Sequence, residues 1–204
     1  MKPSVAASKV QLALRLATKD GLLRARDLNA QKIPRAYLQR LCDRGELEKV
    51  TRGLYRIPDA PVTEHHSLVE VSRRVPHATI CLLSALQVHE LSTQGPHEVW
   101  IAIQRHARKP ALTYPPVHVV RMSGRALTFG VEVRAIEGVK VRITSPAKTV
   151  ADCFRFRRLV GLEAALDALR DYLKKHRNGI DALMKAAAAD RVTNVMRPYV
   201  EALV

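Results

Sequence analysis

Residues 34–58 read PRAYLQRLCDRGELEKVTRGLYRIP, and this stretch decides the fold of the first part of the chain. Pro34 suits the first position of a helix, because its missing N–H would have no partner there. Gly45 ends that helix at about Arg44, where a left-handed backbone costs least. Two short strands follow, joined by the turn Thr51-Arg52-Gly53. The stretch therefore predicts a helix followed by a β-hairpin.

Two more helices are expected before this stretch. Apolar residues recur at three- and four-residue spacing from Val10 to Ala17, which predicts an amphipathic helix over 6–19. Asp20-Gly21 stops it. A shorter helix is expected from Arg24 to Ala30. Three helices followed by a β-hairpin is the element order of a winged helix-turn-helix domain.

Two closely spaced prolines, Pro58 and Pro61, place a domain boundary after residue 60. Residues 61–204 mix helical and strand periods, with helices expected over 64–74 and 84–89 and strands over 78–81, 99–103 and 117–122. Two more strands, over 131–134 and 139–143, are expected to form a hairpin around Glu137-Gly138. From Ser145 the chain reads as helical to its end, with the last helix kinked or split at Pro198. The expected class is α+β: an N-terminal winged helix-turn-helix domain over 1–60, then a mixed α/β domain over 61–204 with a helical C-terminal tail.

The chain is strongly basic. It holds 34 lysines and arginines against 19 acidic residues, a formal charge of +15, and the first 60 residues alone hold 13 against 6. Such an excess needs an acidic partner, and nucleic acid is the one expected. A hydrophobic content of 47% and a charged content of 26% are typical of a folded protein and exclude a long disordered chain.

No targeting or membrane-spanning segment is expected. Charged residues interrupt the apolar positions of the first twenty residues, and the longest apolar runs fall far short of the ~20 residues that cross a bilayer. Cys42, Cys81 and Cys153 lie far apart without C-x-x-C spacing, which is typical of buried thiols in a reducing compartment. The sequence therefore predicts a cytoplasmic protein that does not bind membranes.

The third helix carries the predicted base-reading face. On a helical wheel, Leu38 and Leu41 point one way while Gln39 and Arg40 point the other, with Arg35 near the helix start. Arginine binds guanine through two hydrogen bonds in the major groove, and glutamine can do the same at adenine. The alternative is an ordinary solvated helix face, but the hairpin that follows favours the DNA-binding interpretation.

Sequence-independent contacts to DNA phosphates are expected from basic residues around this helix and at the hairpin tip, namely Arg24, Arg26, Lys32, Lys49 and Arg52. Further basic clusters in the second domain predict a second basic surface that adds attraction to DNA. Each cluster could equally be a solvated face. The nine residues are Arg105, Arg108, Lys109, Arg155, Arg157, Arg158, Lys174, Lys175 and Arg177.

No catalytic site, metal site or cofactor is expected. His65 and His66 face apart on a helix, and His89-Glu90 lacks the second histidine of a zinc-binding H-E-x-x-H helix. The glycines form no phosphate-binding loop. Glu132-Val133-Arg134 is faintly similar to the acidic strand of a metal-dependent nuclease, which keeps an enzyme open as a minor alternative.

The chain also resembles a known family. The run LxxLxxxGELExVxRGLYRIP over residues 38–58 is similar to the winged-helix end of AbiEi-family antitoxins. SALQVHxL over 84–91, the strand over 99–103 and TSPAKTVxD over 144–152 resemble the C-terminal domain of that family. The resemblance covers residues 21–173.

This resemblance implies a bacterial antitoxin and transcriptional autorepressor from a toxin-antitoxin system of phage defence. The N-terminal domain is expected to bind inverted repeats in the double-stranded DNA of its own promoter. The C-terminal domain is expected to help neutralise a cognate nucleotidyltransferase-like toxin encoded next to it. The matched Ser84, His89, Thr149 and Asp152 either hold the fold through buried hydrogen bonds or touch a partner.

Two alternatives from other classes stay open besides an enzyme. One is a general nucleic-acid-binding protein of RNA or of the nucleoid, and the other is a stand-alone transcriptional regulator without a toxin. A repressor should prefer one duplex over random DNA by ~10³ or more, whereas a general binder should not.

Overall fold

The computed structural model describes residues 5–20, 22–25, 28, 31, 33–51, 53–58, 64–92 and 95–203. The chain divides into two compact units. Unit 1 comprises Met1–His66 with Ala135–Val139, and unit 2 comprises Ser67–Arg134 with Lys140–Val204. The boundary predicted after residue 60 lies outside the described residues, as do Arg26, Lys32 and Arg52.

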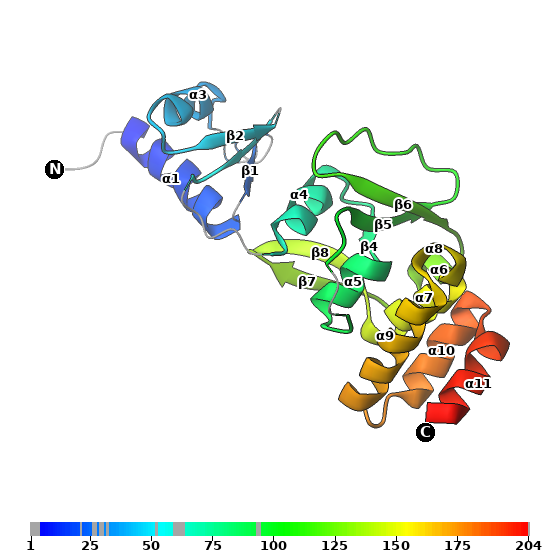
Figure 1. The fold of residues 1–204 in the computed structure, drawn as a ribbon. Coiled ribbons are helices and arrows are strands. Elements are labelled where there is room, and N and C mark those ends of the chain that lie inside the picture. The colour runs from blue at the N-terminus through cyan, green and yellow to red at the C-terminus, as the bar shows by residue number, and fades with distance from the viewer. Residues whose placement is uncertain are drawn as a thin grey trace. The chain divides into compact units, whose positions relative to one another are not determined.

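The described part of unit 1 contains the expected helices and hairpin (Figure 1). Helix α1 (Val5–Asp20) and helix α3 (Ala36–Asp43) confirm the first and third predicted helices to within two residues. Strands β2 (Glu48–Thr51) and β3 (Leu54–Arg56) form the predicted hairpin. Gly45 and Gly53 have φ angles of +69° and +80°, the left-handed backbone that both turns require.

A third strand, β1 (Leu22–Arg24), completes an antiparallel sheet in the order β1-β3-β2. The prediction of a helix beginning at Arg24 is wrong at that residue. Arg24 pairs with Leu54 in the sheet, and the Ala25 N–H donates to the carbonyl oxygen of Gly53 at 2.9 Å. Ala25 and Leu28, the other described members of the predicted helix, are helical.

The core of unit 1 is formed mainly by α1, β1, α3 and the segments beside them, which explains why the amphipathic patterns fold together. Helix α1 contributes small residues, whereas β1, α3 and the segments beside them contribute larger aliphatic ones. The buried residues are Ala13, Ala17, Leu23, Leu28, Ile33, Leu38, Leu41 and Leu47.

Unit 2 is built on a five-stranded sheet in the order β6-β5-β4-β8-β7. The strands are β4 (Thr79–Ile80), β5 (Val99–Gln104), β6 (Val117–Met122), β7 (Val131–Ile136) and β8 (Val139–Thr144). Strand β4 is antiparallel to β5 and parallel to β8, and β5 is parallel to β6. Helix α4 (His66–Arg74) precedes the sheet, helix α5 (Leu82–Val88) connects β4 to β5, and helix α6 (Arg125–Thr128) connects β6 to β7.

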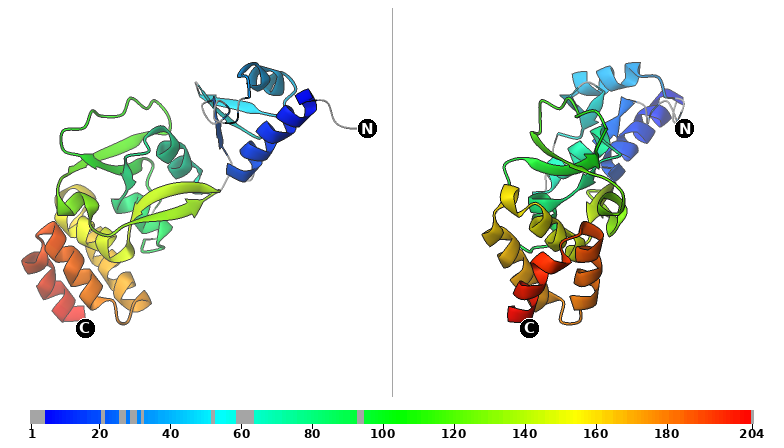
Figure 2. Two further views of the ribbon diagram at one scale, coloured as in Figure 1. Left: turned by 180° about the vertical axis from the view of Figure 1, so that it is seen from behind. Right: turned by 90° about the vertical axis from the view of Figure 1, so that its right-hand side faces the viewer.

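A helical tail follows the sheet, as expected. It comprises α7 (Pro146–Arg155), α8 (Arg157–Val160), α9 (Leu162–Lys175), α10 (Ile180–Asp190) and α11 (Thr193–Leu203). Helices α5, α9, α10 and α11 all contact α7, whose Phe154 is fully buried at the centre of the unit 2 core. Figure 2 shows this tail packed at one end of unit 2. Helix α11 runs across Pro198, so the predicted split at this residue does not occur.

Across the described ranges, the structure contains no helix that is long and apolar enough to cross a membrane.

Candidate nucleic-acid interface

Helix α3 separates an apolar face from a polar one. Leu38 and Leu41 are buried, whereas Gln39 and Arg40 are exposed, as is Arg35 immediately before the helix. Arg35 and Gln39 lie four residues apart and so project from the same side. The three predicted base-contacting side chains are therefore accessible at the start and along the outer face of one helix.

Two of these side chains make contacts in the free protein. The Gln39 Nε2 donates to Asp43 Oδ1 at 2.9 Å. The Arg40 guanidinium lies 5.7 Å from the centre of the Tyr37 ring. Both contacts are at the surface and contribute little, so each side chain can turn toward a base at small cost.

The structure describes only part of the predicted phosphate-contacting set. Lys49 is exposed on β2, and Arg24 is the last residue of β1. Arg56, on the neighbouring strand, forms an ion pair with Glu48 at 2.8 Å. Its positive charge is therefore already partly neutralised within the hairpin.

The predicted second basic surface is spread over unit 2. Arg105, Arg108 and Lys109 lie in the loop between β5 and β6, which we call the β5–β6 loop (residues 105–116). The other groups lie at the α7–α8 junction and at the end of α9. Figures 1 and 2 place the β5–β6 loop and the end of α9 at opposite ends of unit 2. The fold therefore does not build one surface from all nine residues.

Several of these basic side chains already have partners within unit 2. The Arg155 Nη1 donates to the carbonyl oxygen of Asp190 at 2.8 Å, and the Arg157 Nη1 donates to that of Phe154 at 2.9 Å. Lys175 pairs with Glu90 at 3.1 Å. These groups hold helix ends in place, which makes them weaker candidates for a ligand than the exposed cations of the β5–β6 loop.

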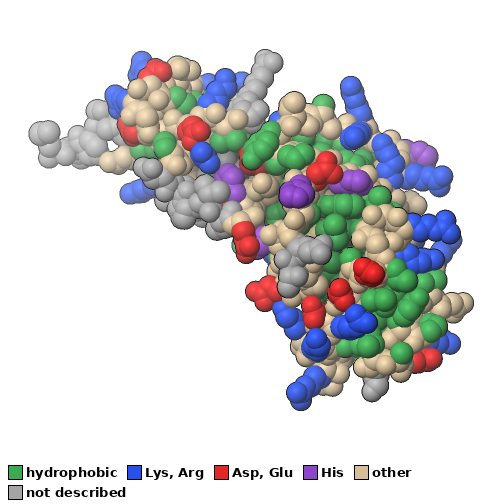
Figure 3. Space-filling model, viewed as in Figure 1, with side chains coloured by type: hydrophobic (Ala, Val, Ile, Leu, Met, Phe, Trp, Pro, Cys, Tyr) green, Lys and Arg blue, Asp and Glu red, His purple; other side chains and the backbone are tan. Residues whose placement is uncertain are grey.

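A cavity of unit 2 beside α9 is lined by more acidic than basic side chains. It has a volume of about 800 Å³ and lies between α9 and the segment before β5, with Trp100 in its lining. Figure 3 shows acidic and basic side chains interspersed over α9, whereas basic ones gather over the β5–β6 loop. Arg170 and Lys174 also line the cavity and pair with Asp167 and Asp171. The acidic side chains outnumber these two, so the cavity is a weaker candidate for binding phosphate. Its acidic lining residues are Glu98, Glu163, Asp167 and Asp171.

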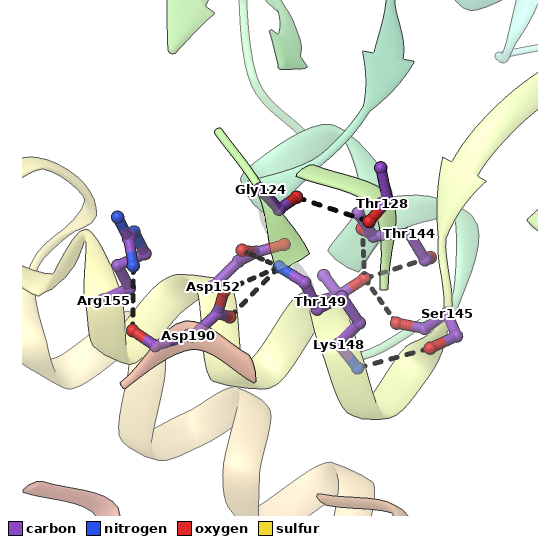
Figure 4. A network of polar contacts seen from close by, with 9 residues as sticks. All are labelled: Gly124, Thr128, Thr144, Ser145, Lys148, Thr149, Asp152, Arg155 and Asp190. Atoms are coloured by element: carbon purple, nitrogen blue, oxygen red, sulfur yellow. Dashed lines mark hydrogen bonds and ion pairs between the residues drawn. The ribbon is translucent and has the colours of Figure 1, made fainter. Parts of the chain in front are cut away.

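A buried ionic network lies beneath the motif over 144–152 (Figure 4). The Lys148 side chain has an exposed fraction of 0%, and its Nζ donates to Asp152 Oδ1 and to both carboxylate oxygens of Asp190, at 3.0 and 3.1 Å. Burial, together with the nearby Asp190 carboxylate, raises the pKa of Asp152 well above its ordinary value, although Lys148 opposes this shift. The network ties α7 to the end of α10.

The other motif residues are also held inside unit 2. The Thr149 hydroxyl lies 2.8 Å from that of Thr144. The His89 Nε2 donates to the Thr144 carbonyl oxygen at 2.7 Å, and burial lowers the pKa of His89. The Ser84 hydroxyl accepts from the backbone N–H of Trp100 at 2.9 Å. Of the two roles left open by the sequence, buried hydrogen bonding is the one these contacts provide.

Gly130 packs against this network, and Gly130→Ala should lower the free energy of unfolding by roughly 1–3 kcal/mol. Its φ is +63°, and an added Cβ would lie 2.8 Å from the Cβ of Lys148. Thermal unfolding followed by circular dichroism measures the effect. Gly45→Ala is the control, because Gly45 also has a positive φ but nothing lies within 4 Å of an added Cβ. Equal losses in the two variants would show that the contact with Lys148 is not tight.

The described residues contain no group of three or more His, Cys, Asp or Glu side chains that could hold a metal ion. Burial raises the pKa of the Cys81 and Cys153 thiols, which keeps both protonated and poorly nucleophilic.

Comparison with known proteins connects unit 1 to a family. Residues 11–58 match the family model described as transcriptional regulator, AbiEi antitoxin. No curated protein matches the chain significantly. The matched segment runs from Gln11 in α1 to Pro58 after β3 and includes all of α3 and the hairpin. The predicted resemblance is therefore confirmed over residues 21–58, within the segment 11–58 that matches the AbiEi antitoxin family of transcriptional regulators.

Proposed function

We propose that this chain is a DNA-binding antitoxin that represses its own operon. In this proposal residues 1–60 form a winged helix-turn-helix domain that binds inverted repeats in the promoter. Residues 61–204 form an effector domain that helps to neutralise a nucleotidyltransferase-like toxin. The observation that carries the proposal is that the match to a transcriptional regulator family, over 11–58, contains a helix with an exposed reading face.

The arrangement of α3 supports entry into the major groove. Buried Leu38 and Leu41 fix the helix on the core of unit 1, so that Arg35, Gln39 and Arg40 are carried on the outside of a rigid element. The major groove admits a helix, and these side chain types match its donor and acceptor pattern. The β2–β3 hairpin directly follows α3, in the position of a wing.

A reporter assay tests the regulatory part of the proposal. The DNA upstream of the gene is fused to a reporter, and expression is compared with and without the protein. We expect repression that is lost when the inverted repeats are scrambled at constant base composition. Equal reporter expression with and without the protein would show that the chain does not repress its own promoter.

Co-expression tests the antitoxin part. Cells that express the adjacent nucleotidyltransferase-like gene should stop growing, and the full chain should restore growth. An Arg35→Ala, Arg40→Ala variant serves as control, because it should lose DNA binding and yet still restore growth. No rescue by the unaltered chain, with repression intact, would identify a stand-alone regulator.

A further inference from the structure

The β5–β6 loop is tied down at both of its ends. The Arg121 Nη1, on β6, donates to the carbonyl oxygens of Arg105 and Ala107, each at 2.7 Å. At the other end, the Arg74 Nη1 donates to the carbonyl oxygen of Tyr114. These arginines join segments that are far apart in the sequence, so the loop between them is held in one arrangement against the sheet and the end of α4.

This loop and the end of α4 border a shallow cavity of about 450 Å³ that is open to solvent. Its polar lining consists of Arg74 and His77 from the end of α4 and the segment after it, and of Arg108 and Lys109 from the loop. The rest of the lining is apolar, and no carboxylate is part of it. We call this cavity the loop pocket.

The two loop cations lack counter-charges. Arg108 and Lys109 are exposed, and neither forms an ion pair within the described residues. This distinguishes them from Lys175 and from Arg155, which have partners elsewhere in unit 2. Like charges around one cavity repel each other, and a bound anion relieves that repulsion.

The chemistry of the lining favours a phosphate group. Arginine presents two parallel N–H donors that match two phosphate oxygens, and lysine adds a point charge. Because Arg74 also holds the loop, its guanidinium is already oriented before a ligand arrives. An arrangement fixed in advance loses less conformational entropy on binding than free surface side chains lose.

We propose that the loop pocket binds a backbone phosphate of duplex DNA, through Arg108 and Lys109 with Arg74 and His77 beside them. This inference rests on the proposed DNA-binding function and adds a sequence-independent contact made by unit 2. It also explains why the second unit of a regulator carries basic side chains that pair with nothing in its own fold.

The test uses the full chain with Arg108→Gln and Lys109→Gln together. Binding to the promoter duplex is titrated at several salt concentrations. We expect the slope of log affinity against log salt to become shallower by about one to two units, with roughly tenfold or greater loss of affinity at low salt. The pair Lys140→Gln and Arg142→Gln is the control, because it removes the same two charges from exposed positions on β8.

One further variant and two possible outcomes complete the test. The exchange Arg108→Lys with Lys109→Arg should keep the wild-type slope, because it keeps the charges. An unchanged slope in the glutamine pair, or an equal change in the control pair, overturns the inference while DNA binding stands. Failure of the unaltered chain to bind any duplex overturns the proposed function and the inference together.

Free phosphate is the other source of the same chemistry. Inorganic phosphate, titrated at constant ionic strength, should shift the amide resonances around Lys109 only weakly, because a single free anion makes fewer contacts than a duplex. Saturable binding of free phosphate in a protein whose DNA salt slope is unaffected by the glutamine pair would assign the loop pocket to a small anion and overturn the DNA assignment.

Discussion

Lys148→Met should lower the free energy of unfolding of unit 2 by about 3–5 kcal/mol. The substitution keeps the length of the side chain but leaves the Asp190 carboxylate buried and without its cation. Asp190 has an exposed fraction of 1%, so water cannot replace the lost partner. Trp100, the one tryptophan of the chain, lies in unit 2, so its fluorescence in a urea titration reports the unfolding of this unit.

Two control substitutions separate the effect of breaking the buried network from the effect of replacing a lysine. Lys185→Met removes an exposed lysine that pairs with Asp181 on the surface of α10, and it should change stability by less than about 1 kcal/mol. Asp152→Asn should also be milder than Lys148→Met, since it keeps a side-chain oxygen that accepts from the Lys148 Nζ, and burial already disfavours the charged form of Asp152 by raising its pKa. A loss from Lys148→Met as small as that from Lys185→Met would show that the network does not stabilise the fold.

The raised pKa of Asp152 also determines in which direction the free energy of unfolding changes with pH. Above the ordinary value of 3.8, the unfolded chain releases the Asp152 proton while the folded chain retains it. Folding then takes up a proton, so the contribution of Asp152 to stability falls as pH rises from about 4 toward the raised pKa. The Asp152→Asn variant has no titrating group at this position, so it does not lose stability in this way. The unfolding free energy of the variant relative to wild type should therefore increase between pH 4 and pH 8.

Arg35→Ala and Arg40→Ala should each weaken binding to the promoter duplex by about 1–3 kcal/mol and should reduce the preference for that sequence. The reason is the loss of paired hydrogen bonds to base edges. Fluorescence anisotropy with labelled duplex measures both effects. Arg15→Ala is the matched control, because Arg15 is an exposed arginine on α1, outside the proposed reading face. If both variants keep full affinity and selectivity for the promoter duplex, α3 is not the helix that contacts the bases.

Local patterns predicted the elements of unit 1 well. The spacing of Leu38 and Leu41 and the positions of Gly45 and Gly53 depend only on nearby residues, and they were sufficient for α3 and the hairpin. Strand β1 was missed, because its three residues carry no strand period of their own. They become a strand only by pairing with β3, about thirty residues later in the chain.

Long-range contacts limited the prediction of the site in the same way. Nothing in the motif over 144–152 indicates that Lys148 reaches Asp190, which is 42 residues away. Arg74 was predicted as the end of a helix, but its role appears only where the β5–β6 loop returns to it, 40 residues later. Arg108 and Lys109 could be selected from the sequence, whereas Arg74 and the grouping of all three around one cavity could not.

The central claim is sequence-specific DNA binding by the full chain, and competition tests it most directly. The protein is bound to labelled duplex carrying the inverted repeats of its promoter and is then titrated with unlabelled specific duplex, scrambled duplex or RNA at one salt concentration. We expect the specific duplex to compete at least ~10³ times better than the others. Equal competition by all three would contradict it and would identify a general nucleic-acid-binding protein.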